Sequence, residues 1–407
     1  MHLHPARSWR HCQPQFSTVW SLQGSHHGAQ MQRIQAFLNE NNVHTPCLII
    51  DLDQVRRNYD ELQRLLPRMS VFYAVKANPA PEVIRTLVEA GSSFDVASVP
   101  EINLCLELGA TPARLSYGST IKKERDISYA YSRGIRLFAF DSEEELLKIS
   151  RAAPGSLVFC RLAVRNDGAL CPLHAKFGCS QTMAEDLMRL ARHVGLVPYG
   201  ASFHVGSQQT CVGQWDAALS RVKSLLATLQ EHSIDLQAVN LGGGLPAQGY
   251  ADAVPAVSEY TDAINRAIVG HFGARNALLL MIEPGRAIVA DAGVLQAEVV
   301  LVARKSNDDC KRWVYLDAGR FNGLAETLDE AIAYNITTSR DGEETEPVIL
   351  AGPTCDSVDV IYEKKEYSLP VGLRAGDLVQ FHSTGAYTAS YASVAFNGFP
   401  PIQTYCI

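Results

Sequence analysis

Eight short apolar runs, separated by helix-like segments, are the feature that most constrains the fold of this chain. The runs are rich in Val, Ile, Leu and Phe, as buried strands are. They cover residues 71–75, 93–97, 114–118, 136–140, 157–164, 198–203, 237–241 and 278–282. Strands that alternate regularly with helices favour a parallel sheet, and eight such repeats predict a closed (β/α)8 barrel in the α/β class.

The segments between the runs carry apolar residues at helical spacing. They cover residues 81–89, 99–108, 122–132, 142–152, 182–193, 215–232 and 257–272. A strand over 47–52 and a helix over 53–66 come before the first barrel strand. We therefore expect the barrel domain to cover residues 51–286.

The pattern changes after residue 286, where strand-like runs follow one another without regular helices. These runs cover residues 294–303, 313–316, 348–351, 358–362 and 377–381, and one short helical stretch covers 325–333. This pattern predicts an all-β C-terminal domain over residues 287–407. Segment 31–50 is expected to join that domain, because chain termini often lie close together.

The first thirty residues are rich in His, Gln and Ser and contain no acidic residue. They show neither the apolar core of a signal peptide nor helical periodicity, whereas an amphipathic helix begins at Met31. We expect residues 1–30 to be an unstructured extension. A misassigned start codon is the favoured explanation, and a transit peptide is the alternative.

Composition excludes several classes of function. The net charge is −7, and the acidic and basic residues are interspersed, which gives no footprint for nucleic acid or an anionic membrane. No apolar run is long enough to span a membrane. The ten cysteines are scattered singly, which favours reduced thiols in the cytoplasm. Cys171, His174 and Cys179 fit no standard ligand spacing, so no metal site is predicted.

The active site of such a barrel lies at the carboxyl ends of its strands. Those ends carry polar residues and a glycine loop, namely Lys76, Asp95, Arg161, His204 to Ser207, Gly242 to Gly244 and Glu283 to Arg286. Lys76 directly follows an apolar run. An ammonium is rare at such a place unless it is paired or takes part in catalysis, so we expect a catalytic amine. A neutral lysine amine forms a Schiff base with an aldehyde cofactor such as pyridoxal phosphate. The plain alternative is a lysine that ends a strand at the surface.

The other strand ends suit the same cofactor. The backbone N–H groups of Gly242 to Gly244 can approach a phosphate, with Arg286 as a charged partner, although a tight turn has the same composition. Glu283 would be costly to bury unless it met a cation such as a protonated pyridine nitrogen. His204 is either a satisfied core histidine or a ring that packs on the cofactor.

Seven motifs in this order resemble the fold type III pyridoxal phosphate decarboxylases, which include ornithine, lysine, diaminopimelate and arginine decarboxylases. The motifs are residues 73–78, 94–98, 203–207, 242–244, 283–286, 352–356 and 385–387. The resemblance runs from about residue 32 to Ile407. It implies an alanine racemase-like architecture, in which the barrel is followed by a β domain.

The resemblance also implies roles for individual residues. Lys76 would carry the cofactor, Glu283 would hold the pyridine nitrogen, and His204 would stack on the ring. The phosphate ligands would be Ser207, Gly243, Gly244, Arg286 and Tyr387. Asp95 and Arg161 complete the expected cofactor site.

By the same resemblance, Cys355 would return a proton to the substrate α-carbon in the neighbouring subunit of a homodimer with shared sites. A surface ion pair between Lys176 and Asp359 of the partner subunit would support that interface. Without the resemblance, a cysteine in such a turn is more often a small buried residue.

The substrate is expected to be a small cationic amino acid. The pair Cys355-Asp356 is similar to ornithine-type enzymes, whose acidic residue holds the distal ammonium. Glu326 and Asp329, three residues apart on the predicted helix, are further candidates for that role, although a solvated helix face is the plain alternative. Eukaryotic ornithine decarboxylases carry a Tyr-Asp pair near Glu326, and this chain does not, so it resembles bacterial ornithine or lysine/ornithine enzymes.

The expected activity is decarboxylation of L-ornithine to putrescine in polyamine biosynthesis, with L-lysine to cadaverine as a second activity. The alternatives are a diaminopimelate decarboxylase, an amino-acid racemase on a similar barrel, or a non-catalytic regulator of polyamine synthesis. A regulator is expected to lack the lysine or the phosphate contacts, which this chain retains.

Overall fold

The computed structural model describes residues 25–172, 176–394, 397 and 400–407. Its contacts divide the chain into two units, one up to Asn42 and one over Val43–Ile407. In the first unit, helix α1 (Ser25–Glu40) contains Ile34, Phe37 and Leu38 at helical spacing. This helix begins at Ser25, so the predicted start at Met31 is late. Residues 1–24 of the predicted extension lie outside the described residues.

In the second unit, eight parallel strands close into a barrel, as predicted, in the order β10-β11-β2-β3-β4-β5-β6-β8. The strands are β2 (Met69–Ala74), β3 (Ser93–Val96), β4 (Leu115–Tyr117), β5 (Leu137–Phe140), β6 (Leu157–Arg161), β8 (Val197–Ser202), β10 (Ala238–Asn240) and β11 (Leu279–Ile282). Their apolar side chains are almost all buried, which explains why the strands read as continuous apolar runs.

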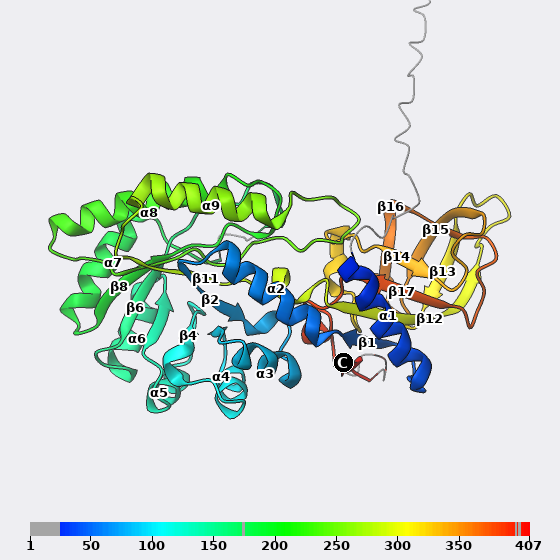
Figure 1. Ribbon diagram of the computed structural model, residues 1–407, viewed down its shortest axis with the longest axis horizontal. Helices are drawn as coiled ribbons and strands as arrows, with labels where there is room; N and C mark the ends of the chain where they lie inside the picture. The colour runs from blue at the N-terminus through cyan, green and yellow to red at the C-terminus, as the bar shows by residue number, and fades with distance from the viewer. Residues whose placement is uncertain (1–24, 173–175, 395–396, 398–399) are drawn as a thin grey trace, which may run out of the picture. The chain divides into compact units, whose positions relative to one another are not determined.

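Helices connect the strands and pack around the barrel (Figure 1). They are α2 (Leu52–Leu65), α3 (Pro81–Glu89), α4 (Val99–Glu107), α5 (Glu124–Ser132), α6 (Glu143–Ala152), α7 (Gln181–His193), α8 (Gln214–Glu231), α9 (Val257–Phe272) and α10 (Arg286–Val289). Side-chain caps fix several starts, as where Ser180 Oγ accepts from the Met183 N–H at 3.2 Å. Helix α8 buries its apolar stripe, including Trp215, Leu219 and Val222, and thereby covers the barrel.

The C-terminal residues, together with one strand from near the N-terminus, form an eight-stranded sheet, which confirms the predicted β domain. The main path is β14-β17-β12-β13-β15-β16, and β1 pairs with both β12 and β18. The strands are β1 (Cys47–Ile50), β12 (Gly293–Ala303), β13 (Arg312–Leu316), β14 (Ile336–Thr338), β15 (Thr345–Ala351), β16 (Val360–Pro370), β17 (Leu378–His382) and β18 (Gln403–Cys406). The short strands β14 and β18, and a separate ribbon of β7 (Ala169–Cys171) and β9 (Ser207–Gln209), were not predicted.

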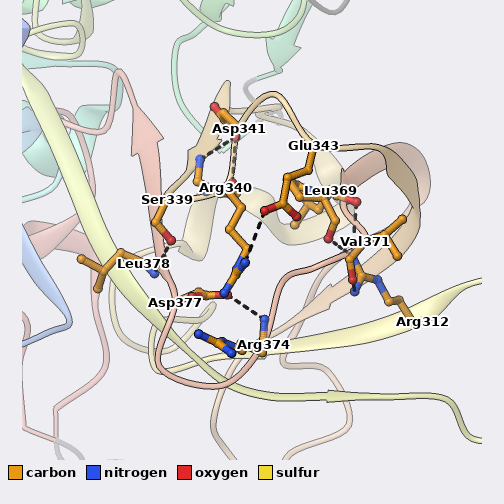
Figure 2. Close-up of polar contacts among 12 residues, drawn as sticks. Arg312, Ser339, Arg340, Asp341, Glu343, Leu369, Val371, Arg374, Asp377 and Leu378 are labelled. Carbon is orange, nitrogen blue, oxygen red and sulfur yellow. Dashed lines mark hydrogen bonds and ion pairs between the residues drawn. The ribbon is translucent and has the colours of Figure 1, made fainter.

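Charged side chains tie the connecting turns of this domain together (Figure 2). Arg340 Nε lies 2.5 Å from Asp377 Oδ2, and the same oxygen accepts from the Arg374 N–H at 2.8 Å. Arg312 Nη1 donates to the Val371 carbonyl at 2.9 Å. The β14–β15 and β16–β17 connections are therefore held by charge-assisted hydrogen bonds.

The short helix η3 (Ala325–Glu330) departs from the predicted regular helix over 325–333. The chain kinks at Leu328 and Asp329, and Asp329 and Glu330 have φ values of +53° and +58°. As a result Glu326 points inward while Asp329 is exposed. The prediction that these two carboxylates share a helical face is wrong, because the three-residue spacing holds only for helical dihedral angles.

The barrel and the β domain meet beside the end of β2. Asn78 Nδ2 donates to the Gly385 carbonyl at 2.8 Å, and the Tyr387 N–H donates to the Ala77 carbonyl at 2.8 Å. These bonds bring Tyr387, a residue of the β domain, to the mouth of the barrel next to Lys76.

Candidate active site

A pocket opens at the carboxyl ends of the barrel strands and collects most of the residues predicted for the site. It is lined by Ala74, Lys76, His204, Ser207, Gly243, Gly244, Leu245, Glu283, Gly285, Arg286 and Tyr387. The strand ends that were separate in the sequence therefore meet at one place, as the barrel topology requires.

Lys76 lies in η1 (Val75–Ala77), directly after β2, and its amine faces the end of β3. Nζ donates to Asp95 Oδ2 at 3.2 Å. The pocket walls partly desolvate the amine and oppose its charge, although the side chain is 47% exposed, but the negative charge of Asp95, with contributions from Tyr387 and Glu283, outweighs this effect and raises the pKa of Lys76. Asp95 therefore favours the protonated amine and fixes its position at the end of β2.

The position of Asp95 depends on a glycine at the end of β4. A Cβ atom at Gly118 would lie 2.0 Å from Asp95 Oδ1, so no larger residue fits there unless Asp95 moves. Asp95 Oδ1 has no hydrogen-bond partner among the described residues. The carboxylate is thus packed against backbone on one side and offers its other oxygen to Lys76.

Glu283 follows β11 and accepts a hydrogen bond from Asn240 Nδ2 at 2.5 Å. Burial, reinforced by the negative charge of Asp95, raises the pKa of Glu283 to about 7. A nearby cation would stabilise the charged form of this carboxyl, and a protonated ring nitrogen would be such a cation. Asn240 was missed in the sequence, where the available signal was a polar residue at the end of a barrel strand.

His204 presents its ring beside the glycine loop. Its Nδ1 accepts from the Gly206 N–H at 3.0 Å, and a Cβ atom at Gly243 would lie 3.0 Å from Nε2. Burial, with the positive charges of Arg161 and Lys76, lowers the pKa of His204 well below its ordinary value. The imidazole is therefore neutral, as a ring that stacks on an aromatic cofactor should be.

Arg286 occupies the other end of the pocket. Its Nη1 donates to the Tyr250 hydroxyl at 2.9 Å, and its Nη2 donates to Ser207 Oγ at 3.3 Å. Both terminal nitrogens also donate to Glu326, at 2.6 and 2.5 Å. The Tyr387 ring centre lies 4.9 Å from Cζ. Tyr250 was not predicted, because a tyrosine in a connecting segment gives no signal of its own.

Comparison with known proteins now decides the family. Residues 52–290 match the sequence model of the family described as pyridoxal-dependent decarboxylase, pyridoxal binding domain. The chain belongs to this family. Its cofactor is pyridoxal phosphate, and the predicted resemblance to decarboxylases is confirmed.

Three relatives illustrate the range of this decarboxylase family. Lysine/ornithine decarboxylase of Selenomonas ruminantium is 34% identical over 355 residues, 87% of this chain and 88% of that protein. Antizyme inhibitor 2 of Xenopus laevis is 32% identical over 366 residues, 86% of this chain and 78% of that protein. The solved structure of Paramecium bursaria Chlorella virus arginine decarboxylase superposes with a TM-score of 0.85 at 27% identity, covering 92% of this chain and all of that one.

The pocket of this decarboxylase fits its cofactor on structural grounds. An amine, a carboxyl with a raised pKa and a neutral aromatic ring face the same space. At the end that suits the phosphate, the buried Nε of Arg286 has no partner among the described residues. An orphaned cationic donor beside Ser207 and the glycine loop is what a phosphate oxygen would satisfy.

Arg161 lies near the pocket without lining it. It ends β6, and its guanidinium lies 5.2 Å from the Phe177 ring centre. Its positive charge contributes to the lowered pKa of His204 and interacts with Glu283. In this decarboxylase Arg161 therefore acts on the site through its charge.

Cys355 and Asp356 do not line the pocket of their own chain. Both are exposed on the β domain, where the Cys355 N–H donates to Asn397 Oδ1 at 3.1 Å and Asp356 Oδ1 accepts from the Val358 N–H at 2.9 Å. Their exposure overturns the plain alternative of a buried structural cysteine.

Asp359 differs from the surface ion-pair partner that was expected. It is only 2% exposed, and its oxygens accept from the Arg320 N–H and from the N–H and hydroxyl of Thr354 at 2.7 to 3.0 Å. Within its own chain, the Asp359 carboxylate organises the loop that carries Cys355 and Asp356, and its pairing with Lys176 of another subunit stays a prediction.

In the sequence, Cys171, His174 and Cys179 come nearest to a possible metal cluster. In the structure Cys179 Sγ lies 3.5 Å from Cys160 Sγ, and His174 lies outside the described residues. The described part of the chain contains no group of three metal-ligating side chains. In the same part, none of the helices is both long and apolar enough to cross a bilayer.

Proposed function

We propose that this decarboxylase converts L-ornithine to putrescine in polyamine biosynthesis, and L-lysine to cadaverine as a second activity. The observation that carries the proposal is an exposed Asp356 beside Cys355, together with a complete cofactor pocket. An exposed carboxylate next to a proton donor suits a substrate with a distal ammonium. The named activity of the Selenomonas ruminantium relative supports the same substrates.

The residues of the pocket divide the work. When bound, pyridoxal phosphate supplies an aldehyde for amine capture and a ring that withdraws electrons from the substrate α-carbon. Lys76 would supply the amine, which the hydrogen bond to Asp95 Oδ2 at 3.2 Å holds in place. Glu283 would favour a proton at the ring nitrogen, and the neutral ring of His204 would pack against the cofactor. The phosphate would be held at the other end of the pocket by Ser207, Gly243, Gly244, Arg286 and Tyr387.

Among the three candidate carboxylates, Asp356 is the one proposed for the distal ammonium. Glu326 is paired with Arg286, and Asp329 is exposed beyond the kink of η3. Because Asp356 and Cys355 do not line their own pocket, we propose that they act in the site of a second copy of the chain. The assembly would then be a two-fold homodimer in which each site takes residues from both subunits.

The substrate proposal is tested with purified protein and pyridoxal phosphate against ornithine, lysine, arginine and diaminopimelate, with released carbon dioxide as the readout. We expect kcat/KM to be highest for ornithine, with lysine next. One methylene separates the two substrates and is worth about 1 to 3 kcal/mol. Preferential release from diaminopimelate would reject the ornithine assignment, and racemisation without release would reject decarboxylation.

The shared-site proposal is tested by mixing two inactive variants, Lys76→Ala and Cys355→Ala, under conditions that exchange subunits. Random pairing makes about half of the dimers mixed, and each mixed dimer has one intact site of two, so activity should recover to about a quarter of wild type. No recovery despite demonstrated exchange would mean that Lys76 and Cys355 serve one chain, or that Cys355 is structural.

Two further aspects follow from the same residues. The nine described cysteines are all free thiols, which supports the proposed cytoplasmic location. Retention of Lys76, Glu283, Arg286 and Cys355 argues against a non-catalytic regulator, because such a protein has no need of an amine and a phosphate site.

A further inference from the structure

The ion pair between Arg286 and Glu326 joins the barrel to the β domain inside the pocket wall. Nη1 lies 2.6 Å from Glu326 Oε2, and Nη2 lies 2.5 Å from Oε1, so the carboxylate holds both ends of the guanidinium fork. The two side chains are 4% and 9% exposed. A two-pronged pair at this depth is strong and geometrically specific.

Glu326 is presented to Arg286 by a fixed turn. The Glu330 carboxylate, beyond the kink of η3, accepts from the consecutive N–H groups of Glu363, Lys364 and Lys365 at 2.6 to 2.9 Å. At the other end of η3, Thr327 Oγ1 donates to the Leu324 carbonyl at 2.7 Å. Because η3 is anchored to strand β16, Glu326 cannot follow Arg286 freely if the arginine moves.

The guanidinium uses every donor except one. Nη1 serves Tyr250 and Glu326, and Nη2 serves Ser207 and Glu326, whereas the buried Nε has no partner among the described residues. The edge formed by Nε and Nη2 is thus the one that points toward Ser207. An anion bound at this edge would share one guanidinium with the Glu326 carboxylate, so two negative groups would face the same single positive charge.

We propose that Glu326 is an internal counter-anion of Arg286, which opposes phosphate binding and thereby sets the affinity of the chain for its cofactor. The inference rests on the proposed role of Arg286 in the phosphate site. It gives Glu326 a positioning role, in place of contact with the distal ammonium of the substrate.

Removing the Glu326 charge should have two effects: the stability of the cofactor-free protein should fall, and the affinity for phosphate should rise. Removing one partner of a buried ion pair leaves an uncompensated charge, so the protein without cofactor should lose stability. Removing a negative charge near a bound phosphate removes a repulsion, so the phosphate should bind more tightly. A residue with only a structural role would show the first effect without the second.

The test compares wild type, Glu326→Gln and the matched control Glu366→Gln, which removes one negative charge from an exposed position on β16. Each cofactor-free protein is titrated at fixed ionic strength with pyridoxal phosphate, with pyridoxal and with inorganic phosphate, and melting is followed in parallel. In Glu326→Gln, Kd for pyridoxal phosphate and for inorganic phosphate should fall about tenfold, because the repulsion is lost. Kd for pyridoxal, which has no phosphate, should stay near the wild-type value.

The melting temperature should complete the pattern. Cofactor-free Glu326→Gln should melt several degrees below wild type, and inorganic phosphate should raise its Tm more than that of wild type, since the anion replaces the lost partner. The control should match wild type in every titration. If the cofactor-free variant does not fold, release of pyridoxal phosphate from the loaded variant on dilution is measured instead, and slower release than in wild type is expected.

Several outcomes would overturn the inference. Phosphate affinity that is unchanged or weaker in Glu326→Gln would mean that the carboxylate does not oppose the anion. A raised KM for ornithine with unchanged cofactor affinity would return Glu326 to the substrate site. Failure of wild type to bind pyridoxal phosphate at Lys76 would instead reject the proposed function, and this result is distinguishable because it appears before any variant is compared.

Discussion

Two lysines at the mouth of the barrel show how the same side chain is used in opposite ways. Lys122, after β4, has a side chain that is 0% exposed and donates to the Ser119 and Ala139 carbonyls at 2.7 Å each. Its third partner is Glu145 Oε1 at 2.9 Å. Lys76, after β2, is 47% exposed and contacts the single carboxylate of Asp95.

The surroundings of the two nitrogens distinguish a structural amine from a reactive one. Burial lowers the pKa of Lys122 to about 8, although Glu145 opposes the shift, and two carbonyls and one carboxylate surround the amine. Among the described residues, the amine of Lys76 donates to Asp95 alone, and its open side faces the pocket. A reactant needs unsatisfied space around the nitrogen, whereas a buried lysine that ties loops together needs none.

The largest expected effect comes from Lys76→Ala. Cofactor capture and product release both need this amine, so turnover should fall on the order of 10^4-fold or more while the fold persists. Borohydride reduction of the loaded wild type, followed by peptide mapping, should fix the cofactor on Lys76. A label on Lys122 or any other lysine would show that Lys76 is not the amine that binds the cofactor.

The next effect is on stability. Lys122→Met should destabilise the protein by about 4 kcal/mol, because Glu145 loses a buried partner and two carbonyls lose their donor. The measurement is denaturant unfolding of the cofactor-free protein. Borohydride labelling of Lys76 in the folded fraction should persist. Near wild-type stability would show that Lys122 is not a structural tie.

Sequence reasoning treated these two lysines unequally, and the reason is physical. Lys76 was found because an apolar run abuts it, which is a local signal. Lys122 was placed at the start of a predicted helix over 122–132, whereas the observed helix α5 begins at Glu124 and Lys122 is buried. The partner that draws it inward, Glu145, lies on a different helix, and no local pattern reports such a pairing.

The same limit explains the kink of η3. Barrel strands and helices could be predicted because apolar periodicity is repeated within each element. The direction of Glu326 depends on Glu330 binding the backbone of β16, far along the chain. The residues that line the pocket from strand ends were therefore predictable, although Asn240, also at a strand end, was overlooked, while Tyr250 and the Arg286–Glu326 pair required the folded structure.

A smaller effect should appear in the pH dependence of Glu283, whose negative charge contributes to the raised pKa of Lys76. Its folded pKa of about 7 lies above the ordinary value of 4.5, so its stabilising contribution is complete below 4.5 and is lost as pH rises through 7. Between pH 5 and pH 8 the cofactor-free wild type should lose up to about 3 kcal/mol by this route. Glu283→Gln should lack that loss in denaturant unfolding, while Glu366→Gln should retain it. An equal loss in Glu283→Gln would assign the titration to another group.

The smallest effect shows whether burial or distance decides how much each lysine around Glu145 contributes to stability. Glu145 pairs with both Lys122 and Lys148. Lys148 Nζ lies 2.5 Å from Glu145 Oε2, closer than Lys122 is to Oε1, yet its side chain is 28% exposed. If short distance decided stability, Lys148→Met would cost as much as Lys122→Met. If burial decides, water can replace the lost ammonium at Glu145 and the cost should be about 1 kcal/mol or less. We expect the second result from denaturant unfolding of the two variants side by side. Equal losses would mean that Glu145 needs both positive charges, and that the contrast between Lys76 and Lys122 rests on charge balance more than on exposure.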